Sequence, residues 1–233
     1  MKKIVFSGVA AKQMVDRFTV TIYNADGEQI SASYTRTIEE YILDLLGKST
    51  TKEAMKTLAV NFLNYGAAAQ DKFGYRPEEL ANRGLSDELK ALATDDSAVA
   101  GVTDERVKGA ALAGTSVAAE YEIIPTTVYA NAKIGSVVKA VVSYENFKGV
   151  EVSYELTADD FGVYNASMTK IEIRGTAVAD GASPITVTLY DANGNIVDQT
   201  VECVNYYCAR MIADHAVFTQ LLKVIYSAKI AFA

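Results

Sequence analysis

One stretch of this chain occurs twice, and this repetition constrains the fold more than any other sequence feature. Residues 1–30 and residues 168–197 align without a gap at a constant offset of 167, and eleven of the thirty aligned residues are identical. Segments of ordinary composition rarely agree this well by chance, so we expect a duplicated structural unit. The identical pairs include Gly8 with Gly175, Ala10 with Ala177, Thr21 with Thr188, Tyr23 with Tyr190 and Gly27 with Gly194.

The bulk composition predicts a folded globular protein and excludes one class of partner. Half of the 233 residues are apolar, which is enough to build a core. The balance of 22 basic against 29 acidic residues, without a cluster of Lys and Arg, lacks the charge pattern of nucleic-acid binding. No apolar run approaches the roughly 20 residues that a membrane-spanning helix needs. Residues 2–11 imitate a signal peptide, but the stretch recurs internally, so we interpret residues 3–6 as a strand and the chain as a fragment or mature piece.

A β-hairpin is predicted in each copy. Residues 17–23 alternate apolar and hydroxyl side chains, which is the period of a strand covered on one face. The turn that follows is Asn24-Ala25-Asp26-Gly27 in the first copy and Asp191-Ala192-Asn193-Gly194 in the second. Glycine at the last position supplies the positive φ that a tight hairpin turn demands. The repeated turn chemistry therefore predicts the same hairpin twice.

Two helices are predicted after each hairpin. Thr37 and Glu40 form a capping box at the start of one helix, and Thr50 and Glu53 form a second box for a helix that ends at Gly74. A short connecting loop makes such helices antiparallel. The repeated unit is thus strand, hairpin, helix, helix. The expected helices cover residues 38–46, 51–73, 204–212 and 218–226.

The region between the copies changes to a β pattern after a polar linker at residues 94–105. Alternating apolar residues on successive short segments indicate an antiparallel sheet packed on one face. We expect an α+β fold, an antiparallel β-sandwich related to Ig-like folds, with an αα-hairpin appended in each of two repeated units. The division falls at residues 1–97 for the first unit and 98–233 for the β strands with the second unit. The expected strands are residues 110–113, 121–124, 126–130, 137–144 and 150–156.

We identify no catalytic residue, no metal-ligand set and no cofactor motif in the sequence. The Asp191 turn imitates a calcium loop, but the sixth place is Ile196 where glycine is required, so a hairpin turn is the preferred interpretation. Cys203 and Cys208 are five residues apart in an expected helix, too far for a disulfide. His215 lacks a nucleophile partner and is expected in a surface loop or as a C-terminal helix cap. The adjacent acidic pairs at residues 39–40, 95–96 and 159–160 are expected to be helix caps or solvated loop residues.

Three tyrosines are the candidate ligand-binding residues. Tyr23 and Tyr190 each end a Thr-x-Thr-x-Tyr face that points away from the apolar side of its strand, and Tyr129 is placed outward by the same alternation. Exposed tyrosines beside hydroxyl groups are surfaces on which sugar rings stack, and the chain contains no Trp. The preferred interpretation is nevertheless structural, with these rings covering a cross-strand neighbour or the helix pair.

The segment from Leu63 to Tyr75, LNYGAAAQDKFGY, with Leu80-Ala81-Asn82, resembles an uncharacterised module in large secreted or surface proteins of anaerobic Gram-positive (Clostridia-type) gut bacteria. The module opens with a Gly-x-Ala-Ala-Lys-x-Met-x-Asp motif, here Gly8 to Asp16. Its middle Tyr-Ser-x-x-x-Tyr motif is kept in part, with Thr35 in place of Ser. The resemblance covers residues 3–82 well and residues 171–231 loosely. It implies an extracellular setting, a modular non-catalytic role and no catalytic residues.

Together these features predict a non-enzymatic structural or interaction module of an extracellular bacterial surface protein. Its expected partners are other protein modules or copies of itself. The alternative is a carbohydrate-binding module that uses the outward tyrosines to hold a glycan.

Overall fold

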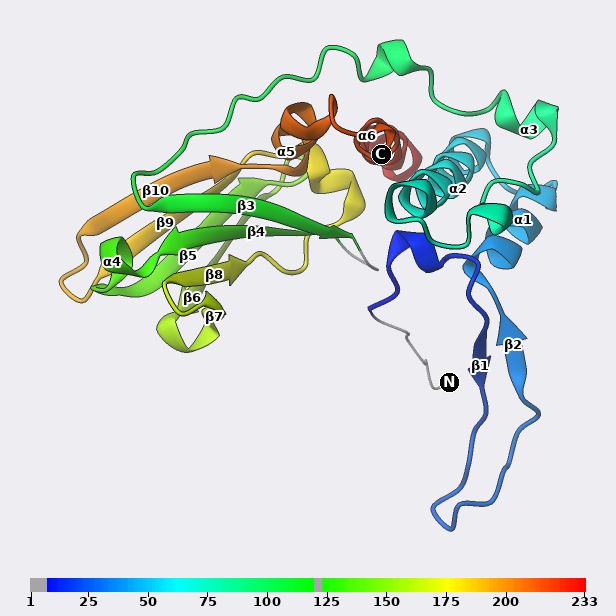
Figure 1. Cartoon of the computed structure of the whole chain (residues 1–233), viewed down its shortest axis with the longest axis horizontal. Coiled ribbons are helices and arrows are strands. Elements are labelled where there is room, and N and C mark those ends of the chain that lie inside the picture. Colours follow the sequence, from blue (N-terminus) through cyan, green and yellow to red (C-terminus); the bar gives the residue numbers. More distant parts are fainter. Residues whose placement is uncertain (1–7, 120–122) are drawn as a thin grey trace. The chain divides into compact units, whose positions relative to one another are not determined.

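The computed structural model describes residues 8–119 and 123–233 and divides the chain into two compact units (Figure 1). The first unit is Met1–Thr94 and the second is Asp95–Ala233, so the boundary lies three residues before the division drawn from the sequence. Residues 3–6, expected to form a strand, and part of the strand expected at residues 121–124 lie outside the described residues. Within the described parts of the chain, no helix combines the length and the apolar character needed to cross a membrane.

The first unit is a β-hairpin followed by an antiparallel helix pair and a short helical tail. Its apolar core is formed where both helices meet the 3₁₀ turn η1, with Val60 and Leu63 of the second helix fully buried. The tail folds back over this core through Ala81 and Leu85. The elements are η1 (Ala11–Gln13), β1 (Phe18–Val20), β2 (Tyr34–Arg36), α1 (Ile38–Gly47), α2 (Glu53–Phe73), η2 (Pro77–Glu79) and α3 (Asp87–Lys90).

The two predicted helix starts in this unit have different outcomes. Thr37 caps α1: its side chain accepts from the Glu40 backbone N–H, and the Glu40 carboxylate accepts from the Thr37 N–H, so the predicted capping box is confirmed. The box predicted at Thr50 is wrong, because α2 begins after Lys52, which makes no side-chain cap. The Thr51 hydroxyl instead donates to the carbonyl of Leu45 and ties the loop to the end of α1.

The second unit contains two four-stranded antiparallel sheets and a helix pair (Figure 1). One sheet has the order β10-β9-β5-β6 and the other has the order β3-β4-β8-β7. A single core cluster takes Val142, Val187 and Leu189 from the first sheet and Tyr129 and Ile171 from the second. The strands are β3 (Leu112–Ala119), β4 (Ile123–Ala130), β5 (Val137–Glu145), β6 (Glu151–Thr157), β7 (Gly162–Asn165), β8 (Met168–Glu172), β9 (Ile185–Asp191) and β10 (Ile196–Glu202).

Helices α5 (Val204–Met211) and α6 (Ala216–Phe232) and the 3₁₀ turn η5 (Val178–Ala182) pack together beside the end of β10, where the chain leaves the sheet. The turn η5 packs against α6, which also contacts α5. Shorter helical turns are η3 (Asp96–Ala98), α4 (Asn131–Ile134) and η4 (Ala158–Asp160). The α+β class and the antiparallel sheets expected from the sequence are thus present.

Candidate functional site

The two hairpin turns share their backbone hydrogen bonds and the bonds accepted by the Oδ1 atom of the first turn residue. In the first, the Asn24 N–H donates to the Glu28 carbonyl at 2.9 Å, and the Asn24 Oδ1 accepts from the Glu28 N–H at 2.8 Å. In the second, the Asp191 N–H donates to the Asn195 carbonyl at 3.0 Å, and the Asp191 Oδ1 accepts from the Asn195 N–H at 2.8 Å. Gly27 has a φ of +82° and the aligned Gly194 a φ of +81°. The predicted turns are therefore confirmed at both places.

The second hairpin is built into a sheet. β9 pairs on one side with β10 and on the other with β5, in the register Lys139 to Tyr190 and Val141 to Thr188. The apolar side chains of β9 lie in the core of the unit, and Leu189 is 0% exposed. This hairpin is consequently covered along its edge and across its apolar face.

The first hairpin has the same apolar pattern but is less covered. Phe18, Val20 and Ile22 align with Ile185, Val187 and Leu189, which are all buried. Phe18 and Val20 are only half-buried, and Ile22 is 45% exposed. Among the described residues β1 pairs with β2 alone. We call β1, β2 and the turn between them the open hairpin, which extends away from α1 and α2 of its own unit (Figure 1).

The backbone of β1 presents hydrogen-bonding groups along the edge opposite to β2. The Ile30 N–H donates to the Ile22 carbonyl at 2.9 Å, so Ile22 directs its backbone groups toward the second strand. Because successive residues of an extended segment direct these groups to opposite edges, we expect Thr19 in β1, and Thr21 and Tyr23 just beyond it, to direct theirs to the outer edge. An edge of this kind is a template for a further strand.

An ion pair occupies the same place in both units with its charges exchanged. In the second unit the guanidinium of Arg210 on α5 lies 2.6 Å from the carboxylate of Glu202 at the end of β10. In the first unit Arg36 at the end of β2 pairs with Asp44 on α1. Both pairs span eight positions and join the end of the hairpin to the first helix.

The contact between the 3₁₀ turn and the second helix pairs a glycine with a large side chain in both units, but the two residues exchange elements. In the first unit Gly66 of α2 makes room for the sulfur of Met14, and a Cβ on Gly66 would lie 2.6 Å from that atom. In the second unit Gly181, which aligns with Met14, makes room for Ile225 of α6. The large side chain is beside the 3₁₀ turn in the first unit and on the second helix in the second unit. The contact between the turn and that helix is kept in both.

The three candidate tyrosines do not form one surface. Tyr23 is 56% exposed, and hydroxyl pairs follow its face of the hairpin, with Thr19 to Thr35 at 2.8 Å and Thr21 to Ser33 at 2.6 Å. Tyr190, its counterpart, is half-buried with the ammonium group of Lys139 above its ring at 5.3 Å.

The outward placement of Tyr129 is wrong. The side chain is 0% exposed and belongs to the core cluster, and burial raises the pKa of its hydroxyl. Alternation fails here because every side chain of β4 from Ile123 to Tyr129 is buried, so both faces of the strand are covered. A strand covered on both sides carries no outward position from which parity can be counted.

The groups with catalytic or metal-binding chemistry have structural partners. Hydrogen bonds from Asn195 lower the pKa of Asp191, whose carboxylate closes the turn. Asp160 caps the η4 turn through the backbone and hydroxyl of Thr157, both at 2.8 Å. His215 lies in the connection between α5 and α6, as expected for a loop residue, but its Nδ1 accepts from the Val217 N–H and caps the N-terminus of α6, so the expected C-terminal cap is wrong. Across residues 8–119 and 123–233, no group of three or more His, Cys, Asp or Glu could hold a metal ion.

Both cysteines are free thiols buried where α5 begins. Cys203 is the N-cap residue of α5 and Cys208 lies within it, so only Cys208 is in the helix that was expected to contain both. Burial raises the pKa of each thiol from its ordinary value of 9.0 to about 12. Since the thiolate is the reactive form, burial disfavours reaction of either thiol in the folded protein.

We expect no thiol labelling by a disulfide reagent at pH 8 in the native protein and two labelled cysteines after denaturation. Because the folded-state pKa of each thiol is raised, its contribution to stability is complete below pH 9 and is lost as the pH rises from 9 toward 12. A Cys208→Ala variant should lose stability more slowly over this range in urea titrations. Rapid labelling of the folded protein at pH 8 would contradict this account.

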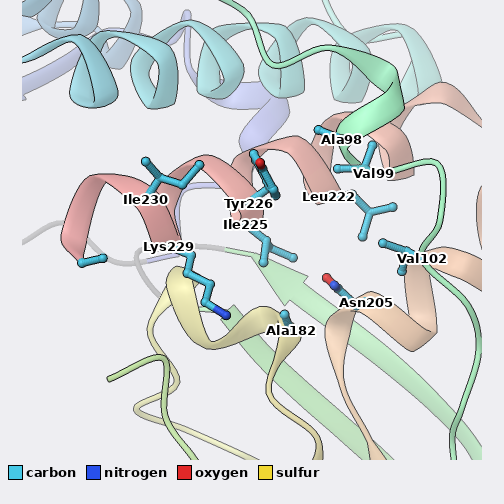
Figure 2. Close-up of a pocket in the computed structure, with 11 residues that line it drawn as sticks. Ala98, Val99, Val102, Ala182, Asn205, Leu222, Ile225, Tyr226, Lys229 and Ile230 are labelled. Atoms are coloured by element: carbon cyan, nitrogen blue, oxygen red, sulfur yellow. The ribbon is translucent and has the colours of Figure 1, made fainter. Parts of the chain in front are cut away.

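The second unit also contains a small, mostly apolar pocket beside α6. Its volume is about 450 Å³, and Figure 2 shows Leu222 and Ile225 of α6 facing Val99, Val102 and Asn205. The Asn205 Oδ1 is buried and lacks a hydrogen-bond partner among the described residues. The pocket could take a small apolar group with one hydrogen-bond donor.

The sequence places the candidate Tyr23 on the open hairpin but does not single out the apolar face of that hairpin as a site. The signal was present, because the repeat places Phe18, Val20 and Ile22 on the apolar face of a strand. The sequence does not show that the aligned Ile185, Val187 and Leu189 are buried, because their burial depends on strands outside the repeat. Comparison with known proteins finds no match for the chain, whether among protein-family models, curated proteins or solved structures.

Proposed function

We propose that this protein is a non-enzymatic interaction module of an extracellular bacterial surface protein, and that it associates with other modules or copies of itself through the open hairpin. One observation carries the proposal: two hairpins with the same turn geometry and apolar pattern differ in that one is enclosed by a sheet and the other is not. Apolar strand positions that are kept with only partial cover support an interaction surface here.

The proposal includes a duplication of one ancestral unit. Both units contain the order 3₁₀ turn, hairpin, helix, helix, which in the second unit follows β3 to β8. The inverted ion pair and the exchanged size pair are what compensating changes in two copies would leave. The two sheets of the second unit, which share a core, support a β-sandwich related to Ig-like folds. In this scheme the first unit corresponds to the hairpin and helix pair of the second unit, without counterparts of the other sandwich strands among its described residues.

The use of reactive groups for structure supports the non-enzymatic role. The cysteines are buried, His215 caps a helix, and the acidic pairs form caps and ion pairs, including Asp96 with Lys223 at 2.6 Å. The extracellular setting rests on the resemblance of residues 3–82 to a module of secreted surface proteins.

Sedimentation velocity of the full chain over a range of concentrations tests the proposal. We expect an increase in mass with concentration that is reduced when Ile22 becomes Asp, because a charge on the open face cannot be buried. The exposed position of Ile22 leaves the monomer folded, which circular dichroism verifies. A species that stays monomeric at all concentrations, with the variant indistinguishable from the parent, would overturn self-association through this surface.

Carbohydrate binding is the second candidate, because Tyr23 is exposed beside a row of hydroxyl pairs. It requires binding to a glycan array that is lost in Tyr23→Ala. Tyr190→Ala serves as the matched control, since that ring is half-buried under Lys139. Glycan binding that depends on Tyr23, in a chain that does not self-associate, would favour this function over the first.

A further inference from the structure

We propose that the partner of the open hairpin is an extended strand with the side-chain pattern of β5, which pairs antiparallel with the outer edge of β1. The inference rests on the proposed function and specifies the partner and its register. It follows from β5 and β9, which form the equivalent pairing inside the second unit.

The register is transferred through the repeat. In the second unit Lys139 lies opposite Tyr190, Val141 opposite Thr188 and Ser143 opposite Thr186. At the offset of 167, Tyr190, Thr188 and Thr186 of β9 align with Tyr23, Thr21 and Thr19. These are the residues of the open hairpin whose backbone groups point to the outer edge.

The side-chain pattern of the partner follows from the core. Ala140, Val142 and Tyr144 of β5 are buried on the same side of the sheet as Val187 and Leu189 of β9. A partner strand with this alternation places its apolar residues on the side of Phe18, Val20 and Ile22. A shift of one residue would turn them to the opposite face, so the register is specified by the face that is buried.

The strand comes from another polypeptide. The chain's own β5 pairs with β9 on one edge and β6 on the other, along nearly its whole length. Releasing it would expose Ala140, Val142 and Tyr144, which are buried in the second unit. A β5-like strand with a free edge, belonging to another module, therefore fits the open hairpin without dismantling either unit.

A fluorescent peptide with the sequence of residues 136–145, SVVKAVVSYE, is the probe, and the full chain is its host. We expect saturable binding by fluorescence anisotropy and slower hydrogen exchange at residues 18–23, with exchange in β9 unchanged. The matched control is a peptide of the same residues reordered so that the apolar side chains occupy the alternate positions. It should bind at least roughly tenfold more weakly.

Thr21→Pro is the matched host variant, because proline removes an outer-edge N–H and is tolerated in an edge strand. It should weaken peptide binding at least roughly tenfold while the circular dichroism spectrum is retained. Equal binding of both peptides, or protection of β9 instead of residues 18–23, would overturn the proposed strand and register. If the full chain still associates through Ile22 in sedimentation, the interaction function stands and only this partner assignment fails.

Discussion

Replacing Leu189 by alanine is expected to destabilise the second unit by about 2 to 5 kcal/mol, the usual cost of truncating a buried leucine. The side chain is 0% exposed and lies in the core cluster shared by both sheets, so its removal leaves a cavity as well as lost apolar burial. The same truncation at the aligned Ile22, which is 45% exposed, should cost less than about 1 kcal/mol.

The two variants form a matched pair, because Leu189 and Ile22 occupy equivalent positions of the two repeated hairpins. Urea denaturation followed by circular dichroism measures the loss of stability. Hydrogen exchange of peptides from β5 assigns the Leu189 effect to the second unit. Equal losses at the two positions would mean that the open hairpin has a core of its own, and the proposed docking surface would then be wrong.

Replacing Arg210 by alanine is expected to cost about 3 to 5 kcal/mol, because it leaves the buried carboxylate of Glu202 without its partner. The Glu202 side chain is only 4% exposed, and the guanidinium also contacts Asp104 at 3.0 Å and the Thr115 hydroxyl at 2.8 Å. Its loss therefore removes at once the contacts of α5 with β10, with β3 and with the segment before β3.

Arg36→Ala is the matched control, since its partner Asp44 is largely exposed. A carboxylate in water retains its hydration when the cation is removed, so this substitution should have far less effect on urea denaturation. A third variant, Glu202→Gln with Arg210→Ala, should recover part of the stability because no buried charge remains unpaired. If Arg210→Ala and Arg36→Ala are equally harmless, Glu202 is hydrated in the native protein and the buried pair contributes little.

Turns and helix starts can be predicted from the sequence where a few neighbouring residues determine the backbone conformation. The turns at Gly27 and Gly194 were predictable because a tight hairpin requires a positive φ, and both glycines adopt it. The start of α1 at Thr37 was predictable because the capping box satisfies backbone groups within four residues. The Thr50 box failed because α2 begins after Lys52, and the neighbouring Thr51 hydroxyl bonds to the preceding helix.

Burial, by contrast, could not be obtained from local pattern. Tyr129 was placed outward because alternation assumes one covered face, whereas β4 is covered on both by its position inside the second unit. The cysteines and His215 were located near the right helices, but their roles depended on where each helix begins.

The duplicated hairpin can be read from the residues alone, because those that shape the turn and alternate along the strands are present in both copies. That Leu189 is enclosed and Ile22 is exposed follows from the folded arrangement of the strands. The reason is physical: the local sequence sets the backbone path and the direction of each side chain. Burial depends on which distant strands pair alongside, and among the described residues only the second hairpin has them.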